Sequence, residues 1–75
     1  TLKYELPEDS FVDVTIYDML GNVVNNLVNA NQSSGYKSLQ WNATNNQGEA
    51  VSAGVYLYKI QAGDFADTKK MVLLK

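Results

Sequence analysis

The chain lacks cysteine, histidine and arginine, and it has a single proline among its 75 residues. Without cysteine, neither a disulfide framework nor a thiolate metal site can form. Without histidine, the chain has no side chain that titrates near neutral pH, and it lacks the usual general base and the commonest metal ligand. Eight acids against six lysines give a net charge of −2, whereas nucleic-acid-binding domains normally carry a basic patch. We therefore expect no nucleic-acid partner and no cofactor.

Long apolar runs are also missing. None approaches the roughly 20 residues of a membrane span, and no signal-peptide pattern opens the chain. The length fits one small domain over residues 1–75, in which only about 60% of the unfolded surface becomes buried. Because the chain starts directly at a strand-like segment, we expect it to be a fragment excised from a larger protein.

Short segments in which apolar and polar residues alternate are abundant, and this alternation is typical of half-buried strands. They span residues 2–6, 11–18, 36–43, 55–62 and 66–75. The apolar spacing of segment 22–30 also fits one helical face, but asparagine is a poor helix former, so we favour a strand with a bulge. Six strands, and a seventh if Val51 forms a short edge strand, predict an all-β sandwich or barrel.

Apolar residues on both faces of the last two segments indicate that both strands are central in their sheet. Trp41, Tyr56 and Tyr58 are expected to fill the core, with their polar atoms reaching backbone partners at its margin. Tyr36, which follows a loop glycine, is the aromatic residue most expected to be exposed. The alternative for these rings is a sugar-binding platform on the surface.

Residue chemistry gives little support for catalysis or for a metal site. Acidic residues gather near residues 8–13 and 64–67, where turn acids normally satisfy backbone donors. Segment 42–49 offers amide oxygens but a single carboxylate, so a turn stabilised by asparagine is favoured over a calcium loop. Asn31 and Asn42 begin glycosylation acceptor triplets, which matter only if the source glycosylates. We expect a domain that is not an enzyme.

Four motifs, in order, resemble those of one bacterial family. They are Val14-Thr15-Ile16-Tyr17-Asp18 followed by Gly21, Trp41-Asn42-Ala43-Thr44-Asn45 followed by Gly48, Gly54-Val55-Tyr56-Leu57-Tyr58-Lys59-Ile60, and Lys69-Lys70-Met71-Val72-Leu73-Leu74-Lys75. The chain resembles the type IX secretion C-terminal sorting domain and the similar immunoglobulin-like domain of the flagellar hook-cap protein. Ala43 stands where glycine is commoner.

The resemblance implies an antiparallel immunoglobulin-like β-sandwich of about seven short strands. It implies that residues 1–75 are the C-terminal domain of a larger bacterial protein that passes through the periplasm and is secreted or held at the cell surface. Its partner would be the secretion machinery or a cell-surface protein receptor, and the recognised residues would be Lys70, Met71, Val72, Leu73, Leu74 and Lys75. Residues that would maintain the fold are Asp18, Gly21, Trp41, Gly48, Gly54, Tyr56 and Tyr58.

Two alternatives stay open. The fold also serves as a structural or carbohydrate-binding appendage of a surface enzyme, in which case a glycan is the ligand. Residue chemistry by itself favours another role for Lys69, Lys70 and Lys75, as charges that keep an apolar terminal strand from pairing with other chains. If recognition occurs, we expect it at the last strand, whose free edge suits the addition of a strand from a receptor.

Overall fold

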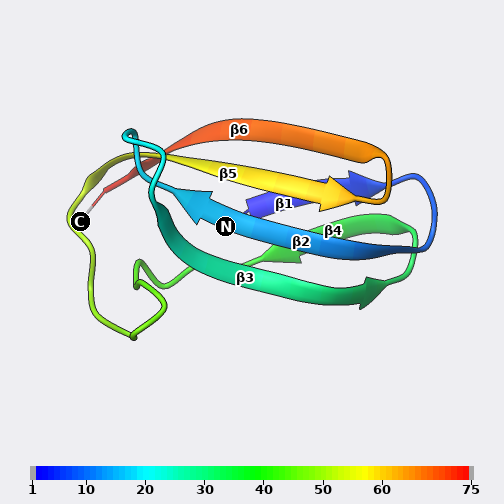
Figure 1. The fold of residues 1–75 in the computed structure, drawn as a ribbon, viewed down its shortest axis with the longest axis horizontal. Coiled ribbons are helices and arrows are strands. Elements are labelled where there is room, and N and C mark those ends of the chain that lie inside the picture. The colour runs from blue at the N-terminus through cyan, green and yellow to red at the C-terminus, as the bar shows by residue number, and fades with distance from the viewer. Residues whose placement is uncertain (1, 75) are drawn as a thin grey trace.

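A computed structural model describes residues 2–74, and it is built entirely from strands and loops within that range. The strands are β1 (Leu2–Leu6), β2 (Ser10–Tyr17), β3 (Val23–Gln32), β4 (Gly35–Leu39), β5 (Gly54–Ala62) and β6 (Phe65–Leu73). A four-stranded antiparallel sheet has the order β3-β2-β5-β6, and β1 pairs with β4 in a second sheet. Figure 1 shows the smaller sheet behind the larger one. The predicted all-β sandwich is therefore confirmed.

The core lies between the two sheets, and its buried residues are alternate residues of three strands, β1, β2 and β5. Its buried apolar side chains are Leu2, Tyr4, Leu6, Val12, Val14, Ile16, Tyr56, Tyr58, Ile60 and Ala62. A polar contact also joins the sheets, since the Tyr4 hydroxyl on β1 donates to the Gln32 side-chain oxygen at the end of β3. Burial raises the pKa of Tyr4, and the hydrogen bond with Gln32 opposes that rise in part.

Tight turns join two of the three neighbouring strand pairs of the larger sheet, β2 with β3 and β5 with β6. The two residues Gly63 and Asp64 join β5 to β6, and every residue of the pair is in regular register from Gly54↔Leu73 to Ala62↔Phe65. The pairing of β2 with β3 is less regular, with register shifts between Val14 and Thr15 and between Ile16 and Tyr17. Segment 22–30 thus belongs to a bulged strand, as predicted, and the helical alternative is wrong.

The number of strands and their ends depart from the prediction in two places. The strand expected over residues 36–43 ends at Leu39, so Trp41 lies beyond it. The seventh strand is reduced to a single bridge between Thr44 and Ala50, while Val51 packs against the core as a half-buried residue. The amide side chains of this segment bond to nearby backbone groups, which competes with strand pairing.

The expectation that both of the last strands are central is wrong for β6. Strand β5 lies between β2 and β6, but β6 is at the edge of the sheet. The apolar residues on its second face do not become covered, since Val72 is 62% exposed. Within residues 2–74, no helix is long and apolar enough to cross a membrane.

Candidate functional site

The terminal stretch expected to carry recognition divides between two faces of β6. Register places Met71 opposite the buried Tyr56, so Met71 and Leu73 face inward and are half-buried. Lys70 and Val72 face outward and are exposed. Leu74 follows the strand and is 84% exposed, and Lys75 lies outside the described residues. The structure therefore offers Lys70, Val72 and Leu74 to a partner, whereas Met71 and Leu73 support the core.

The inward Met71 and Leu73 of this stretch, together with Val72, border a small hollow beside Leu2 and Trp41. Its volume is about 140 Å³, and it is lined by Leu2, Trp41, Met71, Val72 and Leu73. The Trp41 ring packs edge-on against Tyr56, with centroids 5.3 Å apart and planes at 74°. Trp41 is half-buried at the margin of the core, so its expected place is confirmed in part, while Tyr56 and Tyr58 are buried as predicted.

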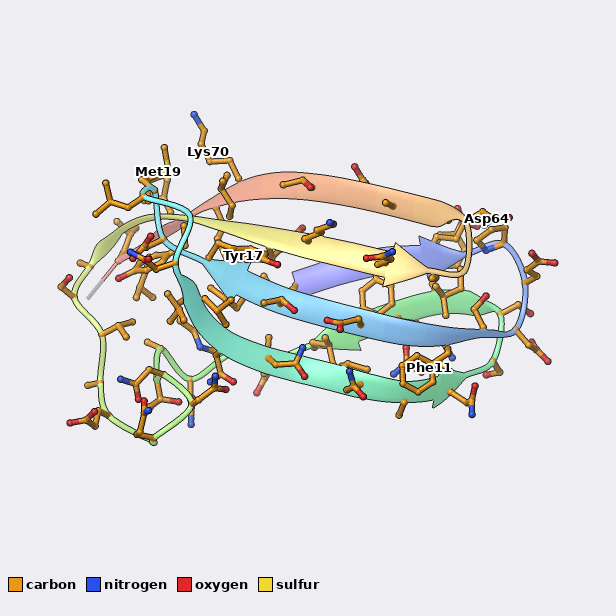
Figure 2. The ribbon with its side chains drawn as sticks, in the orientation of Figure 1. Phe11, Tyr17, Met19, Asp64 and Lys70 are labelled. Atoms are coloured by element: carbon orange, nitrogen blue, oxygen red, sulfur yellow. The ribbon has the colours of Figure 1, made fainter. Side chains whose placement is uncertain are left out.

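An exposed apolar area, here called the terminal patch, adjoins Lys70 and Val72 on the outward face of the larger sheet. Register brings Val55 opposite Val72, and Tyr17 opposite both Val23 and Leu57. Figure 2 shows Tyr17, Met19 and Lys70 at one end of the sheet, with Phe11 and Asp64 at the other. The exposed members of the terminal patch are Met19, Leu20, Val23, Val55 and Val72.

The two edges of the larger sheet differ in their backbone groups. In a two-residue hairpin the flanking pair Ala62–Phe65 exchanges both hydrogen bonds, and alternate pairs repeat this pattern. The N–H and C=O groups of Ala66, Thr68, Lys70 and Val72 therefore point away from β5, and no described strand pairs with them. These residues form the free edge of β6.

At the opposite edge, a loop residue covers part of β3. The Asn46 N–H donates to the carbonyl of Val24 at 3.0 Å. The Asn46 side-chain oxygen accepts the N–H of Asn26 at 3.1 Å. Asn46 thereby occupies two edge groups of β3 in the way a neighbouring strand would, and the bulges of β3 further disfavour pairing.

Asp18 and Gly21, expected to maintain the fold, build the turn between β2 and β3. The Asp18 carboxylate accepts the N–H of Leu20 and of Asn22, each at 2.9 Å. These hydrogen bonds, led by that of Asn22, lower the pKa of Asp18. Gly21 has φ of +89°, a conformation that side chains disfavour. Both residues therefore have a structural role here.

A second turn, around Gly48, repeats this geometry. The Asn45 side-chain oxygen accepts the N–H of Gln47 and of Glu49, each at 3.0 Å. Gly48 has φ of +80° and donates its N–H to the Asn45 carbonyl. The asparagine-stabilised turn predicted for segment 42–49 is thus confirmed, and the Asn45 side-chain oxygen is already engaged by backbone donors.

The remaining motif residues are also structural. The Tyr56 hydroxyl donates to the Ser52 carbonyl at 2.7 Å, and the Trp41 indole N–H donates to the Thr44 carbonyl at 2.8 Å. Gly54 begins β5 opposite Leu73. These contacts hold both ends of the crossover between β4 and β5 against the core.

The acidic residues near the first turn are engaged by neighbouring polar groups. Asp9 accepts the Ser34 N–H at 2.8 Å. Asp13 accepts the Thr15 hydroxyl and the Asn26 amide, at 2.6 and 2.8 Å, and this cluster leaves the outward-facing Thr15 only 8% exposed. Among residues 2–74, no three acidic residues gather as metal ligands.

Sequence reasoning missed the parts of the site that depend on pairing across the sheet. It did not anticipate Asn46 on β3, nor the difference between the two edges. One signal was present, because Asp18-x-x-Gly21-Asn22 and Asn45-x-x-Gly48-Glu49 share their spacing. That spacing indicates two turns of one kind but does not indicate what each turn contacts.

Comparison with known proteins places the chain in one family. No curated protein and no solved structure matches it. The family model for the FlgD Ig-like domain matches residues 1–64, which end before β6, and this family consists of non-catalytic structural domains. By this match and by its immunoglobulin-like sandwich of strands, the chain belongs to the FlgD Ig-like domain family.

Proposed function

We propose that this domain is a non-catalytic module that directs a larger bacterial protein through the periplasm to secretion and attachment at the cell surface. A protein of the secretion machinery, or a receptor at the surface, recognises the outward residues of the terminal strand. The resemblance of Lys69–Lys75 to the end of type IX sorting domains supports this assignment.

One structural observation carries the proposal. Lys70 and Val72 lie on the exposed face of an edge strand, next to the terminal patch, and their backbone groups belong to the free edge of β6. A receptor strand can pair with those groups, while the apolar side chains beside them give it specificity. The half-buried Met71 and Leu73 keep the presented segment in register with β5.

The test measures export of a reporter protein that carries this domain at its C-terminus, in a bacterium with a type IX system. Val72→Asp and Lys70→Glu are expected to leave the reporter inside the cell, because both alter exposed groups of the terminal strand. Phe11→Asp is the matched control, since Phe11 is 52% exposed and lies at the other end of the same sheet.

Thermal unfolding of each purified variant separates a loss of recognition from a loss of folding. All three changes are at exposed positions, so their midpoints should lie within a few degrees of the parent domain. Normal export of both terminal-strand variants would contradict the proposed function. Equal loss of export by the Phe11 control would contradict the assignment of recognition to β6.

A carbohydrate-binding role is the second candidate, and Tyr36 is the observation that favours it. This ring is 86% exposed, as predicted. It borders a shallow hollow of about 530 Å³ that also has Tyr4, Glu5 and Lys37 among its lining residues. An exposed ring beside polar side chains is suited to stacking on a sugar. Binding on a glycan array that is lost in Tyr36→Ala would support this function in place of sorting.

A further inference from the structure

Five side chains of β6 face inward, and the first four of them complement themselves when the strand is reversed. In order these four are Phe65, Asp67, Lys69 and Met71: apolar, acidic, basic and apolar; the fifth is Leu73, near the end of the strand. Within one molecule, the Lys69 Nζ lies 3.9 Å from Asp67 Oδ2. Both side chains are close to half exposed, so each keeps charge available to a second partner.

We propose that β6 pairs with β6 of a second copy of this domain. The two strands run antiparallel about a two-fold axis at Thr68, and they join two four-stranded sheets into one continuous sheet. This interaction goes beyond the proposed function and does not depend on it. It is a property of the free edge of β6 alone.

The phase of the edge hydrogen bonds limits the possible registers. The free N–H and C=O groups belong to alternate residues of β6, namely Ala66, Thr68, Lys70 and Val72. When two copies of β6 pair, each of these residues must therefore lie opposite a residue of the same set on the other copy. An axis at Thr68 meets this condition, because Thr68 then faces its own copy and Ala66 faces Lys70 of the second copy. A two-fold axis midway between two adjacent residues does not meet this condition, because each residue with free groups would then lie opposite a residue whose groups are already bonded to β5.

Charge then selects among the registers that the phase permits. With the axis at Thr68, Asp67 of each copy lies opposite Lys69 of the other, giving two cross-strand pairs of opposite charge. An axis at Asp67 would place two carboxylates face to face. An axis at Lys69 or at Lys70 would do the same with two ammonium groups. The Thr68 axis also places Phe65 opposite Met71, so the apolar ends match.

The rest of the fold leaves room for this contact. In Figure 1, β1 lies behind β5, and β6 extends beyond the outline of the smaller sheet. The opposite edge of the larger sheet is bulged at β3 and covered in part by Asn46. With one open edge on the larger sheet of each copy, pairing through β6 closes as a two-fold dimer and does not extend that sheet into a filament.

The association should be weak, because a single pair of short strands buries less than the roughly 1,200 Å² at the lower limit of stable complexes. Sedimentation equilibrium of the purified 75-residue chain, from about 10 μM to about 1 mM, covers the range expected for such interfaces. The expected result is a reversible monomer–dimer equilibrium. A chain that stays monomeric across this range overturns the proposal.

Charge reversal tests the register. Lys69→Asp opposes carboxylates at both cross-strand pairs and should weaken the dimer about tenfold or more. The double swap Asp67→Lys with Lys69→Asp restores complementarity with the parent net charge, so it should recover the dimer. Lys37→Asp, on β4, carries the same change in net charge as Lys69→Asp and should leave association unchanged. Failure of the swap to recover what the single reversal loses overturns the Thr68 register.

Thr68→Pro tests the backbone pairing. Its N–H belongs to the free edge, so proline removes no hydrogen bond to β5 and is tolerated on an edge strand. This variant should keep the unfolding midpoint of the parent and lose the dimer. Thr68→Val keeps the N–H and should still associate. A dimer of undiminished strength in Thr68→Pro overturns the proposal, because association would then use another surface.

Discussion

Two turns of this domain have the same pattern of hydrogen bonds. The carboxylate side chain stands at the first position of one turn and at the last position of the other, and an amide side chain takes the remaining position in each. In the first turn the Asp18 carboxylate accepts two backbone N–H groups, and the Asn22 side-chain amide donates to the same carboxylate. In the second, Asn45 caps the backbone and donates its amide to the Glu49 carboxylate. The backbone bonds at the base of each turn also correspond. Either oxygen suffices to cap this turn, so the geometry does not require a charge.

The surroundings of the two turns differ more than the turns themselves. The Asp18 turn joins adjacent strands and serves only its hairpin. The Asn45 turn lies in the crossover between the sheets, and its second residue, Asn46, bonds to the edge of β3. A short local sequence thus determines the turn, while the position of that sequence in the topology determines whether it also supports distant parts.

The largest expected effect is a loss of stability on removing Trp41, which holds the second turn, but not the first, against the core. Trp41→Ala deletes the ring that packs on Tyr56 and the indole donor to Thr44. We expect a loss of about 2–3 kcal/mol in the free energy of unfolding, somewhat below the range for a fully buried tryptophan. Denaturant unfolding measures the loss, and hydrogen exchange should be faster at Gly48 but not at Gly21.

Trp41→Phe is the control, since it keeps a ring and removes the indole N–H. It should lose less stability than Trp41→Ala and retain most protection at Gly48. Equal acceleration of exchange in both turns would contradict the assignment of Trp41 to the second turn alone.

Removal of the caps comes next in size. Asn45→Ala leaves the N–H groups of Gln47 and Glu49 without their acceptor, and it loosens Asn46 on β3, so we expect a loss of about 1–2 kcal/mol. Asp18→Ala should destabilise the fold less, because its turn is exposed and local. Denaturant unfolding of both variants gives the comparison, and a larger loss for Asp18→Ala would contradict it.

Alanine at the two turn glycines should have nearly equal effects. Gly21 and Gly48 have similar positive φ values, and no other group lies within 4 Å of an added Cβ at either position. Backbone strain is then the only cost, about 1 kcal/mol in each case. Asparagine tolerates this conformation better, so Gly21→Asn and Gly48→Asn should lose less than the alanine variants. A clear difference between the two alanine variants would show that the turns are not equivalent.

The smallest effect is one of pH and concerns the first turn alone. Because folding lowers the pKa of Asp18 below its ordinary value of 3.8, the stabilisation is complete above that value and is lost as the pH falls through the folded-state pKa. Asp18→Asn should remove this dependence and keep the turn, since Asn45 caps its own turn as an amide. Thermal unfolding of the parent domain and of Asp18→Asn from pH 6 to pH 2 measures this pH dependence of stability. An unchanged acid dependence in Asp18→Asn would assign it to other carboxylates.

Much of the fold could be predicted from local pattern, and the reason is visible in β5. Its alternate residues Tyr56, Tyr58 and Ile60 face the core, so period-two alternation predicted both the strand and its buried face. Alternation carries no information on which strands neighbour each other, and for that reason β6 was wrongly expected to be central. Trp41 was placed in a strand because alternation continues past Leu39, where pairing with β1 has ended.

The candidate site was predictable only in part for the same reason. The motif at Lys69–Lys75 identified the terminal stretch, but its division into an outward set and an inward set follows from register with β5. The free edge of β6 follows from the order of the sheet. The cover over β3 depends on Asn46, whose partners lie about 20 residues away in sequence.

The overhang of β6 beyond the smaller sheet has a consequence for how the domain opens. Strand β2 is held by neighbours on both sides, whereas β6 is joined to β5 alone and its inward side chains are only half covered. Thermal motion can therefore detach β6 from β5 while the other strands stay paired and packed. Amide protons of β6 should exchange through such brief detachment, and those of β2 only when the whole domain unfolds.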